Sequence, residues 1–196
     1  MTQLTTADLR HTVKKVAAFN LGYFGIEFTV AVMIGSVSLF ADSVDFLEDA
    51  SINFLIAVAL AWSARKRAQV GMGLAALIMV PALATLWTAW QKFNMPTPPP
   101  ALPLTLTGLG ALAVNVSCAY MLVRFRAMSG SLTKAAFLSA RNDAYANVAI
   151  VLAGFVTVWT SSAWPDLAVG LGIGLMNAGA AFEVWEEARK EIRDEV

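Results

Sequence analysis

Six long apolar segments fill most of the chain and constrain its fold more than any motif does. Of the 196 residues, 58% are hydrophobic and 14% are charged, with a mean hydropathy of +0.63. Soluble domains are about half apolar and about a quarter charged, so this composition excludes that class. A membrane core about 30 Å thick needs about 20 apolar residues per helix. We therefore predict an all-α polytopic membrane protein with six transmembrane helices, at residues 13–35, 39–62, 70–93, 104–123, 135–159 and 167–185.

Basic residues predict how these helices are oriented. They gather before the first segment, between the second and third, between the fourth and fifth, and after the sixth, whereas the opposite loops carry only Lys92. By the positive-inside rule, both termini are expected in the cytoplasm. The chain then divides into a cytoplasmic tail (1–12), a six-helix transmembrane transport domain (13–185) and a short charged cytoplasmic tail (186–196). The first segment lacks a small-residue cleavage pattern, so we expect it to remain as a helix.

Three of the carboxylates inside these apolar segments are the leading candidates for a functional site. Asp45 and Asp49 are one helical turn apart in the second segment, and Asp143 lies in the fifth. A D-A-x-x-N step begins at Asp49 and again at Asp143. An ionisable residue at membrane depth indicates a functional site by default. Because no matching set of buried Lys or Arg offsets these charges, we expect them to bind a cation or protons.

Other polar residues share helical faces with these acids, since positions three or four apart lie on one side of a helix. We therefore expect four helices to surround one interior cavity. The polar positions are Asp42, Asp45, Asp49 and Asn53 in the second segment, Ser139, Asp143 and Asn147 in the fifth, Asn20, Tyr23 and Glu27 in the first, and Asn115 in the fourth. The amides and Tyr23 are interpreted as interhelical hydrogen-bonding groups.

The remaining charged residues receive less specific interpretations. Asp42 is placed at the entrance of the cavity, because it lies near the external end of its segment. Glu27, Glu48 and Arg141 are interpreted as structural or proton-handling groups, with internal pairing between Arg141 and an acid as one possibility. The single cysteine, Cys118, provides neither a disulfide framework nor a Cys-pair metal site.

Proline and glycine positions agree with the proposed helices. Pro81 is expected to kink the third segment. Pro165 and Asp166 form a helix start, because a carboxylate there meets the positive end of the helix dipole. Small residues give the sixth helix a face for close packing, and they are Gly170, Gly172, Gly174 and Gly179.

The donor set at the centre favours a divalent cation. Asp45 and Asp49 supply two carboxylates from one helix, and Asp143 supplies a third from another. Ser139, one turn before Asp143, adds a hydroxyl oxygen. Together they form a compact site rich in oxygen.

Four stretches of the chain resemble the cation diffusion facilitators, which are divalent metal/proton antiporters. The run from Gly35 to Asp49 resembles the second-helix signature of that family, and Leu109 to Arg124 resembles the fourth helix. Ala136 to Asp143 resembles the fifth helix and Trp164 to Leu167 the start of the sixth. The stretches occur in the family's order along essentially the whole chain. The resemblance implies export of zinc, cobalt, iron, cadmium or manganese.

In that family, helix two supplies Asp or His followed four residues later by Asp, and helix five supplies an equivalent pair. The resemblance thus implicates Asp45, Asp49 and Asp143, and places Ser139 where the family usually has His or Asp. A serine hydroxyl is a weak neutral ligand, so the site is expected to bind more loosely, to recruit water or Asn142, or to prefer a harder metal than zinc.

A second departure concerns the end of the chain. Family members usually continue into a cytoplasmic metal-binding domain, and many carry histidines between helices four and five. Here His11 is the only histidine and the sequence stops soon after the sixth segment. A homodimer is therefore expected to be held by the membrane helices.

These observations predict a divalent metal transporter of the bacterial plasma membrane that exports its substrate, zinc first, in exchange for protons. The carboxylates would bind the cation when deprotonated and take protons when it leaves. We expect neither enzymatic activity nor nucleic-acid binding. The alternative is a metal-binding sensor or assembly subunit of the same fold that transports nothing. An intramembrane aspartyl protease is disfavoured, because the sequence contains no Gly-x-Gly-Asp.

Overall fold

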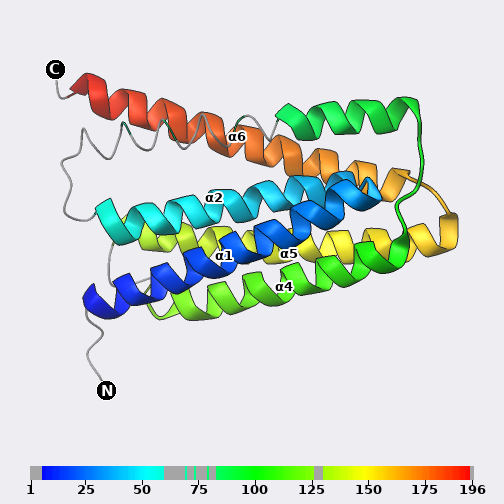
Figure 1. Cartoon of the computed structure of the whole chain (residues 1–196). Helices are drawn as coiled ribbons and strands as arrows, with labels where there is room; N and C mark the ends of the chain where they lie inside the picture. The colour runs from blue at the N-terminus through cyan, green and yellow to red at the C-terminus, as the bar shows by residue number, and fades with distance from the viewer. Residues whose placement is uncertain are drawn as a thin grey trace.

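The chain folds into a bundle of long helices (Figure 1). The computed structural model describes residues 6–59, 69, 73, 79, 83–125 and 130–194. In that part of the chain the regular secondary structure consists of six helices, with no strands. The helices are α1 (Thr6–Ile34), α2 (Val37–Ala59), a segment at 83–94, α4 (Ala101–Val123), α5 (Gly130–Thr160) and α6 (Trp164–Asp194).

The helices confirm the prediction of an all-α membrane protein. Three of them are long and apolar enough to cross a membrane by length and composition, over Ala7–Ile34, Ala101–Val123 and Ala136–Thr160. The helices α2 and α6, of 23 and 31 residues, are also long enough to span, but α2 carries four acids in eight residues, from Asp42 to Asp49. The predicted third span, with Pro81, lies largely outside the described residues.

Antiparallel helix pairs build the bundle. The pairs α1–α2 and α4–α5 pack along their lengths, and α6 packs across α2. Gly35 closes the tight turn from α1 into α2 with a φ of +65°, in the left-handed region that glycine adopts without strain. Figure 1 shows that α1 begins and α6 ends at the same end of the bundle, as an even number of crossings requires.

The close packing of α6 against α2 and against the segment at 83–94 depends on glycines, which have no side chain. A Cβ at Gly170 would lie 2.6 Å from the carbonyl carbon of Val37, and one at Gly174 would lie 3.1 Å from Thr85. The predicted small-residue face is therefore confirmed at these two positions. Gly172 and Gly179 take no part in this contact, because their Cβ positions meet nothing within 4 Å in the part of the chain that the structure describes; at these two positions the packing face stays a prediction.

A buried ion pair joins three segments at the end of the bundle where α2 begins. Lys92 Nζ lies 3.1 Å from Asp166 Oδ2 and also donates to the carbonyl oxygen of Gly35. The carboxylate of Asp166 accepts from the backbone N–H groups of Val37 (2.9 Å) and Ser38 (3.1 Å). Asp166 lies in the first turn of α6, which confirms the predicted helix start, and its side chain also caps the start of α2. Because both ends of the pair are buried and hydrogen-bonded, it fixes α6 against the start of α2.

Two apolar clusters enclose a polar layer between them. The first joins α1, α2, α4 and α5 near the start of α1, and it includes Leu9, Val13, Val16, Ile56, Leu122 and Phe125. The second lies toward the other end and adds α6, with Ala31, Leu39, Leu104, Ile150 and Ile173. The intervening turns of the helices carry the polar side chains.

Candidate metal centre

The helix α2 carries two of the predicted metal ligands. Asp45 and Asp49 are separated by one turn and therefore share a face. Asp49 is buried, with 2% of its surface exposed, whereas Asp45 is half-buried. A run of apolar residues on both sides keeps this stretch helical at membrane depth, so the two acids are held on a rigid element.

The helix α5 places Ser139 and Asp143 against Asp49. The hydroxyl of Ser139 donates to Asp49 Oδ1 at 2.9 Å, and the carboxyl group of Asp143 lies within hydrogen-bonding range of that of Asp49. The structure thus brings together three of the four predicted site residues. Two facing carboxyl groups repel each other when both are ionised, unless a cation or a proton lies between them.

All four predicted residues line one cavity of about 150 Å³. The share of liquid volume of one water molecule is about 30 Å³, so the cavity has room for an ion with several waters. Its lining is Asp45, Glu48, Asp49, Ser139, Asn142, Asp143, Met176 and Asn177. Four of these residues carry carboxyl groups and none is Lys or Arg, which makes the cavity strongly attractive to cations.

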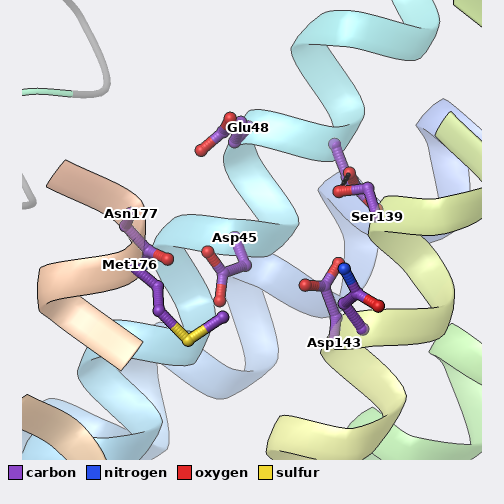
Figure 2. Close-up of a pocket in the computed structure, with 8 residues that line it drawn as sticks. Asp45, Glu48, Ser139, Asp143, Met176 and Asn177 are labelled. Carbon is purple, nitrogen blue, oxygen red and sulfur yellow. Dashed lines mark hydrogen bonds between the residues drawn. The ribbon is translucent and has the colours of Figure 1, made fainter. Parts of the chain in front are cut away.

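Asp45 lies on a different side of the cavity from Asp49, Ser139 and Asp143. Figure 2 shows it between Asn177 of α6 and Asp143 of α5. In the described ranges, no three His, Cys, Asp or Glu side chains are grouped closely enough to hold one metal ion. The interior face that the sequence predicted is present, therefore, but the carboxylates do not form a closed coordination shell.

Helix α6 also contributes to this cavity, which the sequence patterns did not predict. Met176 and Asn177 line it, and Asn177 Nδ2 also donates to the carbonyl oxygen of Ala41 at 3.1 Å. A lone amide in an otherwise apolar, glycine-rich helix was the signal available in the sequence. The amide oxygen adds one more neutral oxygen donor beside Asp45.

Amide side chains support the central carboxylate, as predicted for interhelical hydrogen-bonding groups. Asn20 Nδ2 on α1 donates to Asp49 Oδ2 at 3.4 Å, and Cys118 on α4 contacts the oxygen of Asn20 at 3.5 Å. Asn53 differs from the prediction, because it bonds the carbonyl oxygen of Asp49 within its own helix α2 at 2.8 Å. Tyr23 bonds a backbone carbonyl of α4 at 2.6 Å. Within this group, α1 therefore positions the Asp49 carboxylate directly through Asn20, and α4 contacts Asn20 through Cys118.

Three expectations about the remaining charged residues are corrected or refined. Asp42 is not at an entrance, because it is fully buried and accepts a hydrogen bond from Asn147. Arg141 is exposed, and its guanidinium donates to the amide oxygen of Asn142 at 3.2 Å. It forms no ion pair with Glu27, because the two carboxylate oxygens of Glu27 have no hydrogen-bond partner. Glu48 lines the same cavity as Asp49, because that cavity is wide enough to reach a neighbouring helical face.

The sequence matches one known domain over most of its length. Residues 13–192 match the model of the cation efflux transmembrane domain. This range contains every residue of the cavity. Among proteins with curated descriptions, none matches the chain at a significant level.

Proposed function

The chain belongs to the cation efflux family, the cation diffusion facilitators, and from this we propose that it exports a divalent metal ion across the membrane in exchange for protons. The family is one of transporters and not of enzymes. The proposed substrate is zinc or a related transition metal, with cobalt, iron, manganese and cadmium as further candidates.

One observation carries the proposal: acids from α2 and α5 meet in a cavity whose described lining has four carboxyl groups and no basic residue. An ionised carboxylate inside a membrane protein is costly unless something neutralises it. A divalent cation bound among Asp45, Asp49 and Asp143 would do so from three sides. After the cation leaves, protons would restore neutrality at the same oxygens.

The geometry suggests how the two cargoes compete. Asp49 and Asp143 face each other closely enough to share a proton in the empty site. A metal ion must displace that proton, because a metal ligand has to be deprotonated. Ser139 can keep its hydrogen bond to Asp49 while its oxygen lone pair binds the ion. Proton release and metal binding are thereby linked at one pair of carboxyl groups.

Access from the two sides of the membrane would alternate by rocking of helices. The two apolar clusters that enclose the polar layer would open in turn, as in transporters whose binding site lies near the bilayer midplane. We propose that the protein resides in a bacterial plasma membrane with both termini in the cytoplasm. We also propose a homodimer formed by the membrane helices.

Metal flux into vesicles tests the transport proposal. The protein is reconstituted with a pH-sensitive dye inside the vesicles, and a panel of divalent cations is added outside. Asp49→Asn and Asp143→Asn remove one charge each and leave the side-chain volume almost unchanged. Ser51→Ala is the matched control on α2, because Ser51 only bonds the carbonyl oxygen of Leu47 in its own helix, at 2.8 Å.

Each Asn variant should lose metal uptake and the accompanying pH change, while Ser51→Ala should retain both. Near-normal uptake by either Asn variant would remove the proposed site. A metal-binding sensor or assembly subunit of the same fold remains the second candidate, motivated by Ser139 at a ligand position. Calorimetric metal binding by the wild-type protein without any flux would favour that candidate.

A further inference from the structure

A second pair of acids is buried away from the cavity. Glu27 on α1 and Asp42 on α2 each have 0% of their surface exposed, and neither lines the cavity that contains Asp49. Their carboxyl groups lie within hydrogen-bonding range of each other. Both residues are nearer to the α1–α2 turn than Asp49 is, so the pair occupies a separate level of the bundle.

The oxygens of this pair have too few hydrogen-bond donors. Both carboxylate oxygens of Glu27 and Oδ1 of Asp42 have no partner, whereas Oδ2 of Asp42 accepts from Asn147 Nδ2. Asn147 is fixed in this orientation, because its own oxygen accepts from Asn115 Nδ2 at 3.0 Å. The amides of α4 and α5 therefore supply one hydrogen bond to the pair and leave three oxygens without a donor.

The surroundings provide no compensating positive charge. The titratable groups that interact with the pair are Tyr23 on α1, Asp45 on α2 and Asp143 on α5. The side chains that α4 and α6 present nearby, Asn115 and Asn177, are neutral amides. In the described part of the chain, the buried polar residues include one cation, Lys92, and it is paired with Asp166.

Two carboxyl groups in this arrangement fit one proton between them. A protonated acid becomes a donor while its partner remains an acceptor, and like charges at this distance disfavour ionisation of both. A metal ion instead needs several oxygens arranged around a central space. We propose that Glu27 and Asp42 form a proton-binding site, separate from the metal-binding carboxylates, in which one proton is shared between the two side chains.

The proposed export function gives this site a role in coupling, although its existence does not depend on that function. A divalent ion held by Asp45, Asp49 and Asp143 brings positive charge close to the pair, which favours release of the shared proton to the water outside. The proton returns when the ion leaves. The pair then contributes a countertransported proton without touching the metal.

Infrared spectroscopy of the protein in lipid vesicles tests the site directly, because a protonated carboxyl group has a carbonyl band that ionised carboxylates lack. Metal-free wild-type protein should show this band at about pH 7, where free Asp and Glu, with ordinary pKa values of about 3.9 and 4.3, are ionised. Asp49 and Asp143 also share a proton in the metal-free protein, so Glu27→Gln and Asp42→Asn should each lower the band without removing it, since an amide donates the hydrogen bond that the proton provided. The same loss should occur in a background carrying Asp49→Asn, which separates this pair from the metal centre.

Equal acid bands in wild-type protein and both variants would overturn the proposal, as would absence of the band from the wild-type protein at neutral pH. The wild-type measurement needs no variant to fold. Zinc should lower the wild-type band by more than it lowers the band of Glu27→Gln, and an equal zinc-induced loss in the two proteins would overturn the coupling role. If zinc neither binds nor is transported, the export function fails, but the loss of metal-free band in Glu27→Gln and Asp42→Asn still decides whether the proton site exists.

Discussion

Gly170→Ala tests whether the α2–α6 contact holds the transport domain together. A Cβ at this position would lie 2.6 Å from the carbonyl carbon of Val37 and 2.7 Å from the backbone nitrogen of Ser38. Both atoms belong to the backbone, so a rotamer change cannot relieve the clash. To restore ordinary contact at about 3.4 Å, α6 must move away from α2 by about 0.8 Å.

The expected cost follows from two effects. Overpacking of a close contact typically destabilises by about 1–3 kcal/mol. The same displacement stretches the bonds from Val37 and Ser38 to Asp166, each of which joins a donor to a carboxylate. We therefore expect the upper end of that range, about 3 kcal/mol, or a melting temperature lower by roughly 6–12 °C for a chain of this size.

Gly172→Ala is the matched control on the same helix. Its Cβ meets no atom within 4 Å in the described ranges, and alanine favours a helix over glycine by up to about 1 kcal/mol. Thermal unfolding of both variants in the same detergent or nanodisc should show a loss for Gly170→Ala and no loss for Gly172→Ala. Equal melting temperatures would refute the close-contact argument. Metal uptake by Gly170→Ala should also fall, because α6 carries Asn177 into the cavity.

Three further predictions concern the charges. Metal binding should weaken as pH falls from about 8 to about 5.5, since protons compete for the same carboxylates. Calorimetry in buffers of different ionisation enthalpy measures the protons released on binding. A metal affinity that stays constant across this pH range would exclude proton coupling through Asp49. Ser139→His should favour zinc over manganese by about tenfold, or about 1.4 kcal/mol; if every metal in a binding panel weakens equally, Ser139 is not a ligand. Lys92→Met should destabilise the fold by about 3–5 kcal/mol, because Asp166 is left as an unpaired buried charge. Chemical unfolding measures this loss, and the control Gln91→Met, at the exposed neighbouring position, should show no such loss. Equal stability of the two variants would contradict the argument.

The sequence predicts the central features of the site because helix geometry carries them. An apolar segment in a membrane must be helical to satisfy its backbone, and a helix puts residues four apart on one face. These rules place Asp45 with Asp49 and Ser139 with Asp143. They also require the two polar faces to avoid lipid, which predicts that α2 and α5 meet at a shared interior.

The same rules cannot predict the position along the helix axes at which two helices contact each other. Helical periodicity fixes directions around an axis, but a pair such as Lys92 and Asp166 also depends on loop lengths and tilt. The approach of Glu27 to Asp42 depends on the turn at Gly35, where α1 ends. Asp42 was consequently assigned to a cavity entrance, although the packing of α1 and α5 buries it completely.

The charge balance of the interior connects the metal centre with the buried pair. Acids of α1, α2 and α5 face the polar layer, and they are Glu27, Asp42, Asp45, Glu48, Asp49 and Asp143. The buried cation in the described part of the chain, Lys92, already compensates Asp166. Protons or metal ions must therefore neutralise the acids of this layer. When a divalent ion binds, fewer protons are needed to neutralise these acids, and the others are released. Exchange of one metal ion for two protons would keep the interior charge constant, so we expect any coupling ratio to approach that value.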